Sequence, residues 1–230
     1  MEEQRKTEAP STQSDEALLL QMRDQAEKVA ESALKVIGET VHPNRITAMR
    51  IPIGAAAVAT HTVSATAGTI LYAVNTLIDW LDGAAARAAR KGTTEGAKLD
   101  PLVDKVVNGG TMGYLIASGQ SDPLLTASAL LAAASDALSQ LQRGPVVEQT
   151  REAIRAVLNP EACHSTDLHP NVGSIKANVW GKVKMCLQSG SIAVWMAGAQ
   201  HEEARVAAAA GLGASAVLGL IGTIKRWKSR

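Results

Sequence analysis

The first forty residues divide into a polar tail and one amphipathic segment. Residues 1–14 are polar and acidic, and they lack the basic start and apolar run of a secretory signal, so we expect a disordered tail without a cleaved leader. From residue 15 to 40, apolar residues recur at three- and four-residue steps, which predicts a helix with one charged face. Its apolar face comprises Leu18, Met22, Ala26, Val29, Ala33 and Val36. Such a juxtamembrane amphipathic helix packs either on the rest of the protein or on a membrane surface.

Six apolar segments follow, and each is about as long as a membrane span or slightly shorter. They cover residues 46–63, 67–83, 102–117, 124–141, 183–199 and 206–224. Any one of them could be a buried helix of a soluble protein. With the N-terminus inside, however, six spans place nearly all lysines and arginines on one side, with Arg205 as the main exception. The pattern predicts an all-α, polytopic membrane protein. It would be a six-transmembrane-helix bundle with an N-terminal amphipathic helix and both termini in the cytoplasm.

The polar stretch between the fourth and fifth segments is too hydrophilic to span a membrane. It predicts a short helix from Val146 to Leu158, ended by Asn159 and Pro160, and then an irregular loop.

Composition supports the membrane interpretation. The chain of 230 residues has no phenylalanine, two tyrosines and 3% aromatic residues, whereas a soluble core normally buries large side chains. Small residues suit close helix contacts within a membrane. The net charge is +1, and the basic segments are explained by topology and lipid head groups rather than by nucleic acid. Cys163 and Cys186 have no metal-ligand spacing, and we expect both to be reduced thiols.

Four aspartates stand beside these apolar segments, namely Asp79, Asp82, Asp100 and Asp104. The first two lie three residues apart and the last two lie four apart, so each pair shares one helix face. If the two faces meet, the carboxylates repel one another unless cations lie between them. Oxygen ligands suit Mg²⁺, Mn²⁺ or Ca²⁺, and Mg²⁺ is commonly shared with substrate phosphates. Two such ions would polarise a phosphoryl group, and a remaining carboxylate could accept a proton from an attacking hydroxyl.

The helix face that carries the first aspartate pair continues with small residues. Asp79, Asp82, Gly83, Ala86 and Arg87 follow one another at helical spacing, and the two small residues would let a ligand press against the backbone.

Structural roles remain open for the aspartates. Asp100 before Pro101 could be a helix N-cap, and the first pair could form ion pairs with Arg87 and Lys105. Ionisable residues within membrane segments are usually functional, however, and this favours the metal interpretation for the four together.

The aspartates belong to a longer motif that resembles the signature of the CDP-alcohol phosphatidyltransferases, D-x2-D-G-x2-A-R-x8-G-x3-D-x3-D. Every spacing is present in the set Asp79, Asp82, Gly83, Ala86, Arg87, Gly96, Asp100 and Asp104. The opening of the first apolar segment is similar to that family's too, with Pro43, Asn44, Thr47 and Arg50. "LDPLVDK" and "GKVKMCLQ" resemble segments of its phosphatidylglycerophosphate synthase branch.

This resemblance implies a homodimeric integral membrane enzyme, comprising residues 41–230 and located in a bacterial inner membrane. It would transfer a phosphatidyl group from CDP-diacylglycerol to an alcohol and release CMP. Asp79, Asp82 and Asp100 would be the principal ligands of two Mg²⁺ or Mn²⁺ ions. Asp104 would lie at the metal site as the general base. The cytidine diphosphate group would be bound by Gly83, Ala86, Arg87 and Gly96.

The acceptor implied by the synthase branch is glycerol 3-phosphate, an anion that needs cationic partners. The candidates are Arg50, Lys105, Arg143, Lys182 and Lys184, with Arg151 as a weaker one. The residues expected around the acceptor differ from those of the synthase branch. Ser135 stands where an arginine is expected before Asp136, Met185 replaces a threonine, and residues 144–174 look like an inserted cytoplasmic loop. Phosphatidylglycerol, as in cardiolipin synthesis, or another phosphorylated polyol is therefore an alternative acceptor. A membrane protein that binds CDP-lipid without turnover is a third interpretation.

Overall fold

The computed structural model describes residues 12–89, 93, 96–142, 144–160 and 179–228. Over these residues the chain forms eight α-helices, and the prediction of an all-α protein is confirmed. The helices are α1 (Thr12–Thr40), α2 (Pro43–His61), α3 (Ala65–Ala88), α4 (Gly96–Ala117), α5 (Pro123–Leu141), α6 (Val146–Leu158), α7 (Val179–Gly198) and α8 (Glu202–Lys228).

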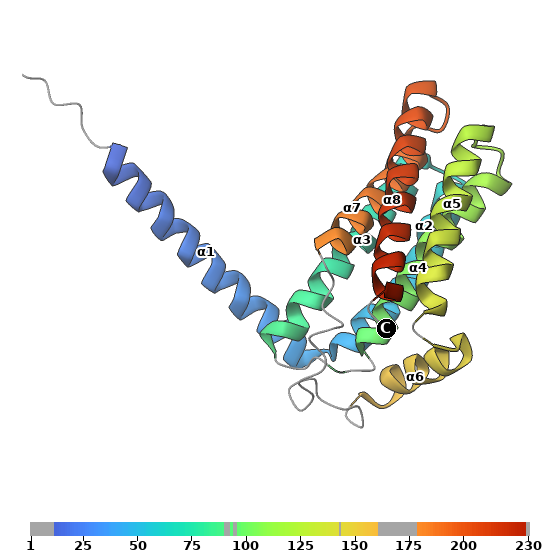
Figure 1. Ribbon diagram of the computed structural model, residues 1–230. Coiled ribbons are helices and arrows are strands. Elements are labelled where there is room, and N and C mark those ends of the chain that lie inside the picture. The colour runs from blue at the N-terminus through green and yellow to red at the C-terminus, as the bar shows by residue number, and fades with distance from the viewer. Residues whose placement is uncertain (1–11, 90–92, 94–95, 143, 161–178, 229–230) are drawn as a thin grey trace, which may run out of the picture.

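Six of these helices coincide with the six apolar segments and run side by side as a bundle. They are α2, α3, α4, α5, α7 and α8 (Figure 1). The short helix α6 lies across one end of the bundle, and α1 extends away from that same end (Figure 1). Within the described part of the chain, two helices are long and apolar enough to cross a membrane by length and composition alone. These are Pro123–Leu141 and Glu202–Lys225.

Small residues bring the bundle helices close together. A Cβ atom added to Gly219 of α8 would lie 2.6 Å from the Ser135 hydroxyl of α5. One added to Gly54 of α2 would lie 3.0 Å from Val107 of α4. Ala132 is completely buried. The alanine- and glycine-rich composition therefore serves helix contacts, as expected for packing within a membrane.

Helix α1 contacts the bundle through its C-terminal end. A Cβ atom at Gly38 would lie 2.8 Å from the Ala85 carbonyl oxygen of α3. Farther from the bundle, Met22, Val29 and Val36 are more than half exposed. The helix begins at Thr12 rather than at residue 15 as predicted, and residues 1–11 lie outside the described part. The C-terminal end of α1 thus packs on the rest of the protein, whereas these apolar side chains are not covered by the described part of the chain.

The start of α4 differs from the predicted N-cap at Asp100. The helix begins at Gly96, whose backbone N–H donates to the Thr93 hydroxyl at 3.0 Å, so Asp100 and Pro101 lie inside the helix. Thr93 therefore satisfies a donor that a helix start leaves free, and α4 begins before the start that Pro101 suggested. Pro101 is the sixth residue of α4, and the helix continues through it although proline lacks the N–H of an intrahelical hydrogen bond. Asp100 is therefore not the N-cap of α4.

The end of the bundle away from α6 is closed by polar contacts between helices. The His61 ring of α2 lies 2.9 Å from the Met196 carbonyl oxygen of α7 and 3.2 Å from the Tyr114 hydroxyl of α4. The Trp195 ring N–H donates to the Gln120 carbonyl oxygen at 2.5 Å.

At this same end, Asp122 caps α5. Its carboxylate accepts the Leu125 N–H at 2.8 Å, and it also accepts the Arg205 Nε–H at 3.2 Å. The backbone hydrogen bond holds the pKa of Asp122 below its usual value. This ion pair also explains why Arg205 is the cation that does not follow the charge bias of the chain.

We expect Asp122→Ala to lower the free energy of unfolding by about 1 kcal/mol, the usual effect of losing a cap. Because the folded-state pKa is depressed, the carboxylate stabilises the protein fully above about pH 4, its unfolded value. The stabilisation is lost as the pH falls through the folded pKa. Thermal unfolding in detergent at pH 7 and pH 3 measures both effects. A constant difference between wild type and variant across this range would contradict the capping role.

Candidate active site

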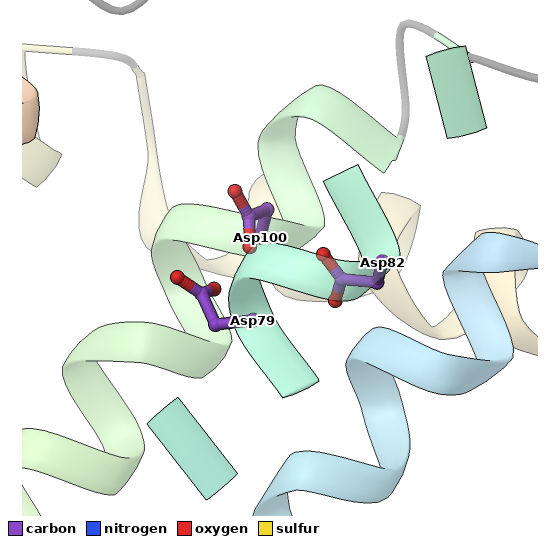
Figure 2. A group of neighbouring side chains, drawn as sticks. All are labelled: Asp79, Asp82 and Asp100. Atoms are coloured by element: carbon purple, nitrogen blue, oxygen red, sulfur yellow. The ribbon is translucent and has the colours of Figure 1, made fainter. Parts of the chain in front are cut away.

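Three carboxylates gather where α3 meets the start of α4. Asp79 and Asp82 come from α3 and Asp100 comes from α4 (Figure 2). One carboxylate oxygen from each can be chosen so that all three atoms lie within 4.8 Å of one another. The three-residue spacing in α3 places the first two on one face, and the early start of α4 brings Asp100 opposite them. Among the described residues, the predicted convergence therefore holds for three of the four aspartates.

Arg50 of α2 lies among these carboxylates. Its guanidinium forms an ion pair with Asp79, and it lies 3.4 Å from Asp100 Oδ1 and 3.1 Å from Asp104 Oδ1. Its side chain is only 3% exposed, and its carbonyl oxygen accepts a hydrogen bond from Asn75 Nδ2 at 3.1 Å. One buried cation thus faces several carboxylates. Arg50 was predicted as a candidate for the acceptor phosphate, and the structure brings it to the carboxylates.

Thr47 and Asn108 position two of the aspartates. The Thr47 hydroxyl donates to Asp82 Oδ2 at 2.7 Å, and Asn108 Nδ2 donates to Asp104 Oδ1 at 3.4 Å. Thr47 lies one turn before Arg50 on the same face of α2, so that spacing could have suggested a shared role. Asn108 and Asn75 carried no signal in the sequence, because their contacts depend on how separate helices pack.

The three carboxylates of Asp79, Asp82 and Asp100 are suitable ligands for a divalent cation. All three donors are carboxylates, which are ligands that Mg²⁺, Mn²⁺ and Ca²⁺ accept. Arg50 supplies a single positive charge at a place where Asp79, Asp82, Asp100 and Asp104 carry up to four negative charges. A divalent ion held by Asp79, Asp82 and Asp100 would reduce that repulsion. Asp104 is outside the three-carboxylate group, and its role as a ligand stays a prediction.

The predicted head-group residues have two different surroundings. A Cβ atom at Gly83 would meet only the Arg87 guanidinium, at 3.4 Å, and Arg87 itself is exposed. Ala86 is half-buried, so this face of α3 leaves room for a ligand near the carboxylates. Gly96, in contrast, is enclosed, because a Cβ atom there would collide with the Asn44 side chain. The absence of a side chain at Gly96 serves packing at the start of α4.

Contacts with α6 connect this corner of the site to the polar stretch between α5 and α7. Asn44 Nδ2 donates to the Thr93 hydroxyl and to the Ala156 carbonyl oxygen, each at 3.3 Å. Lys98 Nζ lies 2.7 Å from Glu152 of α6. The predicted helix in the polar stretch is confirmed, and it supports the segment that carries Thr93 and Gly96.

The remaining acceptor candidates lie in separate places. Lys184 of α7 forms an ion pair with Asp136 of α5, whose other oxygen accepts from Gln188 at 2.7 Å. Lys105 Nζ donates to the Pro101 carbonyl oxygen of its own helix at 3.3 Å, and Lys182 is exposed. Arg143 lies outside the described residues.

Ser135 is 1% exposed and packs against Gly219, so its surroundings leave little space for the arginine that the synthase branch would have there.

The sequence is similar to a known protein family over most of its length. The model of the CDP-alcohol phosphatidyltransferase family matches residues 40–221. A curated protein, the bifunctional IPC transferase and DIPP synthase of Thermococcus kodakarensis, is 28% identical over 105 residues. That alignment covers 46% of this chain and 24% of the relative, so the chain matches about a quarter of the relative's length. No solved structure gives a significant match.

Proposed function

The chain belongs to the CDP-alcohol phosphatidyltransferase family, and on that premise we propose that it transfers a phosphatidyl group from CDP-diacylglycerol to glycerol 3-phosphate. The products would be phosphatidylglycerophosphate and CMP. The observation that carries this proposal is the convergence of Asp79, Asp82 and Asp100 beside the open face at Gly83. A group of hard oxygen ligands next to room for a diphosphate is what this reaction requires.

In this proposal the acceptor hydroxyl attacks the phosphorus that carries the diacylglycerol. A new oxygen–phosphorus bond forms, the bond to the CMP phosphate breaks, and Asp104 receives the hydroxyl proton. Arg87 and the bare face at Gly83 and Ala86 hold the cytidine diphosphate group. Two divalent ions bound by the aspartates would supply charge stabilisation for the diphosphate. Arg50 fixes Asp79 and Asp104 relative to each other through its ion pairs.

We also propose that all six long bundle helices span the membrane, with residues 41–230 as the membrane domain. The distribution of side chains supports this. Trp80, Leu124 and Leu130 are each about 60% exposed on the bundle, while Arg50, Asn75 and Asp82 are buried inside it. Apolar groups outside and polar groups inside suit a lipid solvent. A bacterial inner membrane, cytoplasmic termini and a homodimer complete the proposal, with residues 144–174 as a cytoplasmic insertion.

One observation favours a second acceptor. Lys184 lies near the position of the missing arginine, because a Cβ atom added to Gly219 would contact both Ser135 and Lys184, and the charge of Lys184 is balanced by Asp136. A balanced pair attracts a free phosphate less than an unpaired lysine does. Phosphatidylglycerol, which carries no free phosphate, is therefore the alternative acceptor that this pair favours, and another phosphorylated polyol is a further alternative for the same donor. The T. kodakarensis relative is named an IPC transferase and DIPP synthase rather than a phosphatidylglycerophosphate synthase, which is consistent with a different acceptor.

The experiment that tests the proposal is an acceptor panel. Purified full-length protein in detergent would receive CDP-diacylglycerol, Mn²⁺ and one alcohol at a time, and mass analysis would identify the lipid product. We expect phosphatidylglycerophosphate from glycerol 3-phosphate. Cardiolipin from phosphatidylglycerol would support the alternative acceptor. Binding of CDP-diacylglycerol without any new lipid would support a non-catalytic protein.

We predict that Gly83→Leu raises the KM for CDP-diacylglycerol about tenfold, or about 1.4 kcal/mol of binding free energy. The new side chain would fill the open face of α3, and the fold should tolerate it because a Cβ atom there makes only an ordinary contact. Gly113→Leu is the matched control, since a Cβ atom at that helical glycine meets nothing within 4 Å. Equal KM values for the two variants would exclude Gly83 from the donor site.

A further inference from the structure

A chain of buried polar side chains leads from the bundle interior to Asp104. The Tyr72 hydroxyl of α3 donates to Asn108 Oδ1 of α4 at 2.7 Å. Asn108 Nδ2 then donates to Asp104 Oδ1 at 3.4 Å, one turn earlier on the same helix. Arg50 Nη2 reaches that same oxygen at 3.1 Å. Within the described residues, the hydrogen bonds to Asp104 therefore all end on Oδ1, and none reaches Oδ2.

Tyr72 and Asn108 lie deep in the bundle, where the Tyr72 hydroxyl also has a side-chain hydrogen bond with Ser189 of α7. Tyr72 is 1% exposed and Asn108 is 3% exposed, and Tyr72 lies within the main hydrophobic cluster together with Val103 and Val107. Burying two polar groups costs free energy that their mutual hydrogen bond only offsets. An apolar pair of similar shape would pack there with little loss of stability. Stability alone therefore does not explain this tyrosine and asparagine.

The hydrogen bond from Tyr72 determines which way the Asn108 amide points. Because the amide oxygen accepts from the tyrosine, the NH₂ group is turned toward Asp104. Without the hydroxyl, the amide could rotate and present its oxygen to the carboxylate, which would repel it. Tyr72 thus controls whether Asn108 holds Asp104 or pushes it away.

From this geometry we propose that Tyr72 and Asn108 are positioning residues, which hold Asp104 Oδ1 so that Oδ2 stays free to receive the proton of the acceptor hydroxyl. The inference rests on the proposed function, since it assigns these residues to the reaction of that site. Neither residue touches the substrate in this scheme, and both act through Asp104. Tyr72 belongs to α3, whereas Asn108 and Asp104 belong to α4. The contact between these two helices therefore orients the proposed base.

The two tyrosines of the chain provide a matched experiment. Tyr72→Phe removes the hydroxyl near Asp104, whereas Tyr114→Phe removes a hydroxyl that contacts His61 at the far end of the bundle. We expect Tyr72→Phe to lower kcat about tenfold and Asn108→Leu about 10–100-fold, as for groups that orient an active-site residue. The KM for CDP-diacylglycerol should not change in either variant. Tyr114→Phe should keep the wild-type kcat.

A double-mutant cycle tests whether the tyrosine acts through the asparagine. In the Asn108→Leu background, Tyr72→Phe should cause no further loss of kcat. Mn²⁺ affinity of the metal-free protein, measured by electron paramagnetic resonance, is a readout independent of turnover, and it should be unchanged in both variants. Full additivity in the cycle, a parallel fall in Mn²⁺ affinity, or an equal loss in Tyr114→Phe would each overturn the positioning role.

This experiment separates the inference from the proposed function. If wild-type protein releases CMP and the Tyr72 and Asn108 variants match its kcat, the positioning role is wrong and the proposed function stands. If the wild-type protein forms no lipid product with any acceptor, the proposed function fails and the positioning role falls with it. Tyr72→Phe keeps the aromatic ring, so it remains informative even if Asn108→Leu does not fold.

Discussion

Asp104→Asn should lower kcat by about 10²–10⁴-fold, the usual contribution of a general base, while binding of Mn²⁺ and CDP-diacylglycerol persists. The amide has the shape of the carboxylate but cannot accept the proton of the acceptor hydroxyl. The proposed metal ligands Asp79, Asp82 and Asp100 remain intact in this variant. The loss should therefore fall on the chemical step rather than on the binding of the donor.

CMP release under saturating donor measures the kcat of Asp104→Asn, and equilibrium binding of Mn²⁺ and CDP-diacylglycerol measures what the site retains. Asp122→Asn is the matched control, because it makes the same chemical change at the opposite end of the bundle. It should turn over like the wild type. A kcat for Asp104→Asn close to that of the control would remove Asp104 from the role of base.

Arg50→Met should destabilise the metal-free protein by about 3–5 kcal/mol, the usual effect of leaving buried charges unpaired. The guanidinium is almost completely buried and contacts Asp79, Asp100 and Asp104. Methionine preserves much of the side-chain volume but leaves these carboxylates facing one another without their cation. Divalent ions should restore much of the lost stability, because they supply positive charge to the same carboxylates and bind the folded state.

Thermal unfolding in detergent, with a chelator and with Mn²⁺, measures this effect without any turnover. Arg50→Lys keeps a positive charge at the same helix position and serves as the control, with a smaller expected loss. Mn²⁺ should raise the melting temperature of Arg50→Met more than that of the wild type. An equal rise in both proteins would show that the arginine and the metal do not serve the same carboxylates.

Local spacing made much of the candidate site predictable. Positions three and four residues apart share a helix face whatever the rest of the fold does, so the pairing of Asp79 with Asp82 followed from the sequence. The six bundle helices and α6 were also predictable, since apolar runs and the Asn159–Pro160 break determine where helices form and end.

Contacts between helices were not predictable in the same way. Arg50 meets Asp79 across 29 residues of chain, and Lys184 meets Asp136 across 48. Such pairs depend on the rotation and crossing of whole helices, which small alanine- and glycine-lined contacts determine. The sequence therefore identified the charged residues of the site but not the ion pairs of Arg50 with Asp79, Asp100 and Asp104. It carried no sign that Tyr72 and Asn108 would meet.

The start of α4 illustrates a competition between local signals. An aspartate before a proline is a strong sign of a helix start. Here Thr93 accepts the first N–H of a helix that already begins at Gly96, and Asp100 lies within α4, opposite α3. Its carboxylate is thereby available to the group that includes Asp79 and Asp82.

Metal-dependent phosphatidyl transfer is tested most directly by CMP release from CDP-diacylglycerol. The purified full-length protein would be measured with and without a divalent cation and with and without an acceptor alcohol. We expect CMP only when both Mg²⁺ or Mn²⁺ and an acceptor are present, and none after Asp79→Asn or Asp100→Asn. No CMP with any acceptor, or CMP release that continues in excess chelator, would contradict metal-dependent transfer.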